Sequence, residues 1–227
     1  MIGRVNGACL CHSANNIVCK LALYLSVLSV PLPKGGRKWY PIGVTAYERI
    51  FEASVDSYGL ITVAKAKEMG IRKDVLYKLV ARGRLERVGH GLYKLACPMP
   101  YSGDYAPYAQ SVALIGPEAY LYGESVLAML HLAPTNPKMM FVATPVRVRK
   151  KLEKGFVVLQ NVPCSNVAYY EGVPSQTAAD AIRSCFGTMM PDRLHQAINE
   201  GVRREFLEAG EARQLKRELD ERNKKEA

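Results

Sequence analysis

Apolar residues three and four positions apart predict a helix over 47–57, because that spacing places them on one face that can be buried. A second helix is predicted over 63–69, where Thr62 is the N-cap whose hydroxyl accepts a bond from an otherwise unpaired amide. Gly70 follows where a helix commonly ends in a residue with positive φ. The apolar residues of the first helix are Ile50, Phe51 and Val55.

A third predicted helix, 72–82, has two unlike faces when its residues are projected at about 100° per residue. One face is apolar, with Val75, Leu76, Leu79 and Val80. The other is polar, with Asp74, Lys78, Ala81 and Arg82 opposite the apolar face and Lys73 and Tyr77 on its flank. Short helices joined by a glycine-containing turn, here Gly70-Ile71, are typical of a helix-turn-helix. The cationic face has the long donors that a recognition helix needs in the major groove of DNA.

The segment after this helix has the composition of a β-hairpin. Gly83 ends the helix, and strand-like residues in 85–95 flank Gly89-His90-Gly91, which can form a tight turn. A winged helix-turn-helix has its wing at this place. A solvated amphipathic helix would have the same apolar face as 72–82, so the hairpin is what favours the DNA-binding interpretation.

Positive charge is concentrated in the same segment. The chain has 227 residues, a formal net charge of +10 and a pI near 9.3, which favours an anionic partner. From Arg72 to Lys94, seven Lys or Arg stand against two acidic residues, so this stretch contributes half of the excess. Because clustered cations release counterions from DNA, we predict salt-sensitive binding to double-stranded operator DNA and no membrane partner.

The same pattern assigns candidate DNA contacts. We expect phosphate contacts from cations of the helix and wing and from an imidazole, namely Lys73, Lys78, Arg84, Arg87 and His90. Tyr77 and Arg82 are the candidates for base contacts. Arg72 is a further candidate for a phosphate contact.

The first 44 residues are expected to be a poorly packed extension and linker. Residues 17–32 are largely apolar but interrupted by Lys20, whereas a membrane span needs about twenty apolar residues and a signal peptide needs a small-residue cleavage site. Residues 31–38 have the proline, glycine and basic residues of a linker. An accessory helix and a vestigial signal are alternatives to an extension translated from an upstream start.

Apolar residues make up 48% of the chain and charged residues 23%, which is ordinary for a globular protein with a packed core. None of the six cysteines forms a C-x-x-C pair. Cys9, Cys11 and Cys19, with His12, are a weak candidate metal cluster, and reduced thiols of a cytoplasmic protein are the simpler interpretation. We predict no metal and no cofactor.

Helical and strand-like segments alternate downstream, which predicts a mixed α/β domain over 106–204. The predicted fold class is α+β, with a winged helix-turn-helix at 45–97 ahead of this domain and a charged helix at 205–227 after it. The elements expected within and after the second domain are a helical pair over 116–132, strands over 138–144 and 155–160, a helix over 175–185 capped by Ser175, and a charged helical region over 193–226.

Catalytic residues are hard to find in the second domain. His131 lies between leucines and is expected to be structural, and Glu124-Ser125 is more simply a helix cap than an acid–base pair. Asp180 has no second carboxylate near it in sequence, and His195 has no evident partner. A P-loop and a dinucleotide-binding fingerprint are absent, so we predict no enzymatic activity. The basic run 146–154 is either a second phosphate-contacting surface or a solvated loop.

Several motifs resemble those of the AbiEi-type antitoxins, the regulators of type IV toxin–antitoxin pairs. In the first segment they are Gly70-Ile71, Leu76-Tyr77-Lys78-Leu79-Val80, Gly83-Arg84-Leu85 and Gly91-Leu92-Tyr93. Downstream they are 113–117, 122–125, 130–132, 141–145 with the basic residues that follow, 172–175 and 177–180. The resemblance covers about 47–204 and leaves the first forty residues outside.

This resemblance implies a DNA-binding antitoxin and transcriptional autorepressor of a type IV toxin–antitoxin operon. It also implies a functional link to a nucleotidyltransferase-like toxin, which the antitoxin need not bind directly. Two alternatives belong to other classes: a stand-alone regulator whose second domain senses a ligand or partner, and a nuclease guided by the same DNA-binding segment.

The chain departs from the resemblance at Arg72, where relatives often have a small hydroxyl residue that caps the recognition helix. Arginine cannot accept that hydrogen bond. Its positive charge is also unfavourable at a helix N-terminus, although Asp74 offsets this. We therefore expect the first turn of the helix to fray in the absence of DNA.

Overall fold

The computed structural model describes residues 45–97, 103–135, 138–149, 155–164 and 166–226. Residues 45–97 form the head, and residues 103–226 form the body. The N-terminal extension with its apolar run, the candidate metal cluster of cysteines and His12, and 150–154 of the basic run all lie outside the described residues.

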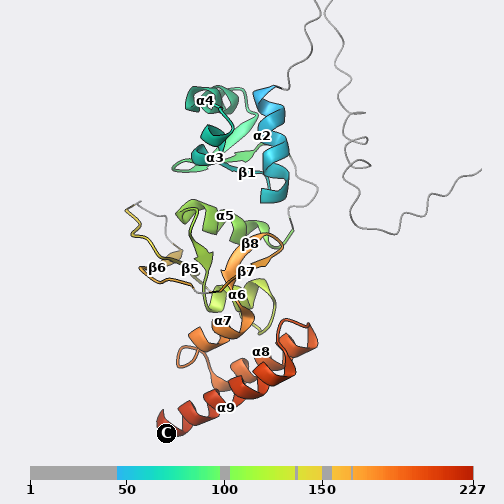
Figure 1. Ribbon diagram of the computed structural model, residues 1–227, viewed down its shortest axis with the longest axis vertical. Helices are drawn as coiled ribbons and strands as arrows, with labels where there is room; N and C mark the ends of the chain where they lie inside the picture. Colours follow the sequence, from blue (N-terminus) through green and yellow to red (C-terminus); the bar gives the residue numbers. More distant parts are fainter. Residues whose placement is uncertain (1–44, 98–102, 136–137, 150–154, 165, 227) are drawn as a thin grey trace, which may run out of the picture. The chain divides into compact units, whose positions relative to one another are not determined.

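The head combines short helices with a small antiparallel sheet (Figure 1). Its elements are α2 (Ala46–Ser54), a 3₁₀ turn (Val55–Ser57), β1 (Leu60–Thr62), α3 (Val63–Glu68), α4 (Lys73–Ala81), β2 (Leu85–Gly89) and β3 (Leu92–Leu95). The strands lie in the order β1-β3-β2. α3 and α4 occupy the residues predicted for the helix-turn-helix, and β2 and β3 form the predicted hairpin.

Side-chain caps begin two of the helices in the head. Thr45 and Glu48 form a capping box at α2, in which the Thr45 hydroxyl accepts from the Glu48 amide at 3.2 Å and the Glu48 carboxylate accepts from the Thr45 amide at 2.6 Å. At α3 the hydroxyl of Thr62 accepts from the amide of Lys65 at 3.1 Å, as the sequence predicted. Gly70 has a φ of 72°, which lets the chain turn from α3 into α4.

One apolar cluster fills the space between the helices and the sheet of the head. It consists of Ile50, Ile61, Ala66, Ile71, Leu76, Leu79, Leu85, Tyr93 and Leu95. The buried face expected for the first helix is confirmed at Ile50 but not at Val55, which is 41% exposed. Val55 lies outside the core because the helix ends at Ser54 and a 3₁₀ turn, which has about three residues per turn, shifts the following side chains around the axis.

The body contains a mixed five-stranded sheet with helices around it. Its elements are α5 (Ala106–Ile115), β4 (Tyr120–Leu121), α6 (Glu124–Met129), β5 (Met140–Thr144), β6 (Phe156–Gln160), β7 (Val167–Tyr170), β8 (Val173–Gln176), α7 (Ala178–Ser184), α8 (Pro191–Arg203) and α9 (Ala209–Glu226). The strand order is β6-β5-β4-β8-β7, with β5–β6 and β4–β8 parallel and the other neighbours antiparallel. The α+β fold class is therefore confirmed.

The last two helices pack against each other and against α7 (Figure 1). Leu194 and Ile198 of α8 and Leu215 and Leu219 of α9 are buried in the same apolar cluster as the strands of the sheet. The charged residues of α9 lie on its remaining faces, because a helix with one apolar stripe keeps its polar residues in solvent.

Two expectations for the body are wrong in detail. The helical pair over 116–132 is instead the short strand β4 followed by α6, since periodicity alone does not separate a short buried strand from a buried helix. Ser175 is no cap: it is buried within β8, and the cap of α7 is Thr177, whose hydroxyl accepts from the Asp180 amide at 3.1 Å. The charged helical region expected over 193–226 is confirmed as α8 and α9, which are separated where Glu205 has a φ of 62°.

Candidate nucleic-acid interface

The helix predicted to contact DNA is α4 (Lys73–Ala81), and its N-cap Arg72 has extended backbone (φ −74°, ψ 151°) and no side-chain cap. The structure thus confirms the prediction that no side chain caps the start of α4. The guanidinium of Arg72 instead turns to the first turn of the helix, where its Nε donates to Oδ1 of Asp74 at 2.9 Å. The two side chains are 82% and 45% exposed, so this ion pair lies in solvent.

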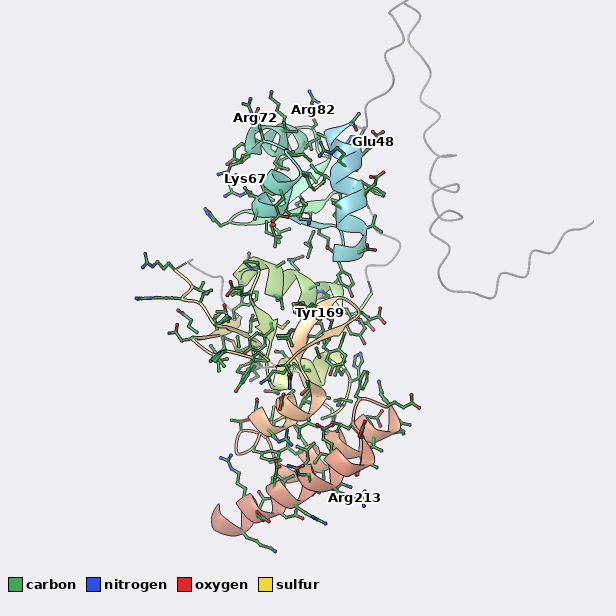
Figure 2. The ribbon with its side chains drawn as sticks, in the orientation of Figure 1. Glu48, Lys67, Arg72, Arg82, Tyr169 and Arg213 are labelled. Atoms are coloured by element: carbon green, nitrogen blue, oxygen red, sulfur yellow. The ribbon has the colours of Figure 1, made fainter. Side chains whose placement is uncertain are left out.

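The outer face of α4 carries most of the predicted contact residues. Leu76 and Leu79 are buried in the head, whereas Lys73, Tyr77, Lys78 and Arg82 are exposed. Arg72 and Arg82 project into solvent from opposite ends of the helix (Figure 2). Tyr77 is 47% exposed, and the ammonium of Lys73 lies 5.6 Å from the centroid of its ring, within the range of a cation–π contact. The helix therefore presents cations around an aromatic ring.

The wing brings a second group of predicted contacts. Gly91 has a φ of 74° at the turn between β2 and β3, and the neighbouring His90 is exposed. The register of the two strands shifts between Arg87 and Gly89, and Nε of Arg87 donates to the Gly89 carbonyl at 3.4 Å. The exposed Arg87 side chain is thereby directed along the wing toward its turn.

Tyr93 of β3 is 1% exposed and lies opposite Arg87 in the hairpin. Burial raises the pKa of Tyr93, the neighbouring Tyr77 raises it further, and the positive charges of Arg87 and Lys73 oppose the rise. The phenol stays protonated at neutral pH. Exposed cations of both α4 and the wing therefore act on the same buried phenol.

Arg84 has a different environment from the other predicted contacts. Its guanidinium lies 5.5 Å from the centroid of the Tyr47 ring, on α2. Burial raises the pKa of Tyr47, Cys97 adds to that rise, and Arg84 opposes it. Arg84, which follows α4, therefore contacts an aromatic residue of α2. Its phosphate contact stays a prediction.

Sequence reasoning missed the cations of α3. Lys65 and Lys67 are both exposed, and Lys65 forms an ion pair with Glu68 at 3.3 Å. Lys67 projects into solvent from α3 (Figure 2). Arg49 of α2 was also missed: its guanidinium donates to the Met69 carbonyl and closes the end of α3. The signal for Lys67 was its position on the polar side of a helix that the sequence did predict.

The candidate residues of the body have structural partners. Oγ of Ser125 accepts from the Phe141 amide at 2.8 Å, and burial raises the pKa of the Cys185 thiol to about 12. Asp180 pairs with Arg183 at 3.3 Å. His195, which had no evident partner in the sequence, lies 3.4 Å from a carboxylate oxygen of Asp220.

The remaining expectations concern metals, membranes and the basic run. Among the described residues, no group of three or more His, Cys, Asp or Glu is arranged to hold a metal. Within the same residues, no helix is both long enough and apolar enough to cross a membrane. Arg147 and Arg149 of the basic run are exposed, and both interpretations of that run stay open.

Comparison with known families identifies the head. Residues 48–96 match the family model described as "Transcriptional regulator, AbiEi antitoxin". The head is thus of the AbiEi type, as its motifs predicted, and this family is one of regulators. The resemblance noted downstream of the head lies outside the matched residues and stays a prediction.

Comparison with individual proteins adds little. No curated protein matches the chain significantly. Among solved structures, the crystal structure of the RV2827C protein from Mycobacterium tuberculosis is 16% identical, covers 81% of this chain and 84% of its own, and has a TM-score of 0.35. A likeness at this level carries no argument about the chain.

Proposed function

We propose that this chain, with its AbiEi-type head, is a DNA-binding antitoxin and transcriptional autorepressor of a type IV toxin–antitoxin operon. The observation that supports the proposal is that α4 and the hairpin after it both carry exposed cations, with Lys73 5.6 Å from the Tyr77 ring and Arg87 opposite Tyr93. If α4 were only a solvent-exposed amphipathic helix, exposed cations would not be expected on the adjacent hairpin as well.

In the proposed complex, α4 enters the major groove and the wing follows the adjacent backbone. Tyr77 and Arg82 contact base edges from the exposed face of the helix. The phosphate contacts come from Lys73, Lys78, Arg84, Arg87 and His90, and Lys67 of α3 joins them. Each neutralised phosphate releases counterions, so affinity falls with rising salt.

Repression follows from occupancy of the operator upstream of the protein's own operon, in the cytoplasm. The toxin of that operon is a nucleotidyltransferase-like protein, and neutralisation proceeds without a stable complex between the two. The body is the part of the chain assigned to neutralisation, because the residues proposed to contact DNA all belong to the head.

A gel-shift titration with Lys78→Ala plus Arg82→Ala tests the DNA interface. Both side chains are exposed, so the head stays folded, and loss of the Arg82 base contact, worth about 1–3 kcal/mol, together with the Lys78 phosphate contact weakens operator binding at least about fivefold. The matched control is Arg213→Ala plus Arg217→Ala, which removes the same charge from exposed positions on α9. Unchanged affinity of the head variant, or an equal loss in the control, contradicts the interface.

The antitoxin role needs a separate assay. Co-expression of the chain with the product of the adjacent gene restores growth if that product is a toxin of the stated class. If the neighbouring gene encodes another kind of protein, or if growth is not restored at normal expression, the antitoxin role is contradicted. The alternative of a stand-alone regulator is then favoured. Incubation of purified protein with plasmid and magnesium addresses the nuclease alternative, because a repressor leaves the DNA intact.

A further inference from the structure

We propose that Arg72 reads a guanine in the major groove of the operator and that Asp74 is the residue that positions it. This inference rests on the proposed function, since it requires α4 to bind DNA. It differs from a phosphate contact, the role that the charge of Arg72 alone suggests.

The first step is the position of Arg72 on the recognition helix. In helix-turn-helix proteins, the N-terminal residues of the recognition helix contact base edges. Arg72 is the N-cap of α4, and its extended backbone leads the side chain away from the helix axis. The side chain is 82% exposed, so its guanidinium is free to enter a groove (Figure 2).

The second step is the geometry of the guanidinium. Nε donates to Oδ1 of Asp74 at 2.9 Å, which uses one of the five donors of the group. The terminal amino groups, Nη1 and Nη2, keep their outward hydrogens. Two parallel donors of this kind match O6 and N7 of guanine, the commonest specific contact of arginine in the major groove.

The third step is electrostatic. Arg72 and Asp74 together carry no net charge, and the carboxylate repels phosphate oxygens that approach the pair. Among the described residues, Lys73, Lys78 and Arg82 form no ion pair, so their charge remains available to phosphates. Counterion release follows net positive charge, which makes the neutral pair a poor phosphate ligand and leaves base recognition as its use.

Stability does not account for the ion pair. Exposed pairs contribute little to folding, and this one lies in solvent on both sides. Asp74 does favour the helix N-terminus through its charge, a role that needs no contact with Arg72. What the contact adds is a preferred orientation of the guanidinium, with Nε turned toward Asp74.

The experiment starts from binding sites selected by the full chain from a randomised duplex library. Affinity for the selected site and for its single-base variants is then measured at several salt concentrations. The proteins are the wild type, Arg72→Ala, Asp74→Asn and, as the matched phosphate-contact control, Lys78→Ala. One duplex carries 7-deazaguanine, which lacks the N7 acceptor, at the guanine assigned to Arg72.

For the wild type we expect one guanine whose replacement, or substitution by 7-deazaguanine, weakens binding about tenfold or more. Arg72→Ala loses that preference and is insensitive to 7-deazaguanine, and its loss of affinity is confined to sites that carry that guanine. Lys78→Ala keeps the preference and lowers the salt slope by about one. Asp74→Asn lowers the guanine preference several-fold and strengthens non-specific binding, with a steeper salt slope, because the freed cation now attracts phosphates.

Other outcomes would contradict either the base contact of Arg72, the positioning role of Asp74 or the proposed function. If Arg72→Ala weakens all sites equally and lowers the salt slope by about one, Arg72 contacts a phosphate and the inference is overturned. If the wild type is insensitive to 7-deazaguanine at every guanine of the site, the inference fails without any variant. If Asp74→Asn changes only thermal stability, Asp74 acts on the helix alone. Absence of any selected sequence refutes the proposed function itself.

Discussion

In the head, the charged side chains lie on the outer face of α4 and along the wing, whereas in the body several polar side chains lie inside. The buried polar residues of the head are limited to Ser54, among those described. In the body they are Ser111, Ser125, Thr144, Ser175 and Gln176. Most polar side chains of the head are therefore available to a partner, whereas several polar side chains of the body form hydrogen bonds inside the fold.

One example of such buried hydrogen bonds in the body lies at Gly123, which has a φ of 50° and is the N-cap of α6. Its amide donates to Oε1 of Gln176 at 2.8 Å, and Nε2 of the same glutamine donates to Ser184 at 3.0 Å. Two segments more than fifty residues apart are thereby joined inside the fold. The helix cap expected at Glu124-Ser125 is wrong, because Gly123 is the N-cap of α6 and no side chain caps this helix.

This difference predicts how substitutions divide. Exposed cations of the head are solvated in the folded and unfolded chain, so their removal changes binding more than stability. Buried polar groups of the body have exchanged water for a protein partner, so removing one partner leaves the other unsatisfied. We therefore expect binding assays to detect substitutions of the exposed cations in the head, and unfolding experiments to detect substitutions of the buried polar residues in the body.

The largest expected effect separates the two apolar cores. Leu76 of α4 and Leu127 of α6 are both 0% exposed, and each change to alanine costs about 2–5 kcal/mol of the free energy of unfolding. We expect Leu76→Ala to abolish operator binding at temperatures where Leu127→Ala still binds. Urea unfolding followed by circular dichroism, beside gel shifts, measures both. Parallel loss of binding in the two variants would mean that head and body unfold as one unit.

The next effect tests the buried hydrogen bonds of the body. Gln176→Ala removes the acceptor of the Gly123 amide and the partner of Ser184, at a cost of about 1–3 kcal/mol in the free energy of unfolding. Operator affinity of the folded variant stays that of the wild type. The exposed Gln196 of α8, changed to alanine, is the control and leaves stability unaltered. A melting temperature equal to that of the control refutes the structural role.

The smallest effect is the pH dependence of an ion pair in the body. The hydrogen bond from Arg183 lowers the pKa of Glu218 below its ordinary value of 4.5. A carboxyl whose folded pKa is lowered stabilises the fold above its unfolded pKa, and this contribution is lost as pH falls through the folded value. Both side chains are about a third exposed, so the pair contributes less than about 1 kcal/mol.

Comparison of the wild type with Arg183→Met measures this contribution. The difference in the free energy of unfolding between the two is present at pH 7 and shrinks as the pH falls below about 4.5. Arg213→Met, at an exposed position of α9, is the control and shows no such dependence. A difference that stays constant from pH 7 to the acid limit argues against an electrostatic role for Glu218.

Much of the head could be predicted because its signals are local. The Thr62 cap, the Gly70 turn, the two faces of α4 and the hairpin after Gly83 each depend on residues a few positions apart. Hydrogen bonds and side-chain contacts within one helical turn or one hairpin decide such features. The positions of the exposed cations on α4 follow from the same periodicity.

The body was harder to predict because its short elements depend on distant partners. β1 of the head shares this property: its three residues have no period of their own, and they pair with β3 some thirty positions later. Tyr120 and Leu121 form a strand only because β5 and β8 lie on either side of them. Ser175, read as a helix cap, is instead held in β8 beside β4 and β7.

By itself, the sequence determined the order of the head's helices and hairpin, the concentration of charge along them, and the absence of a side-chain cap at Arg72. Only the tertiary structure decided that Arg87 lies opposite the buried Tyr93, that Arg84 lies over Tyr47, and that the Arg72 guanidinium turns to Asp74. The first set depends on neighbours along the chain. The second depends on loop closure, side-chain rotamers and burial, which bring together groups that no spacing in the sequence relates.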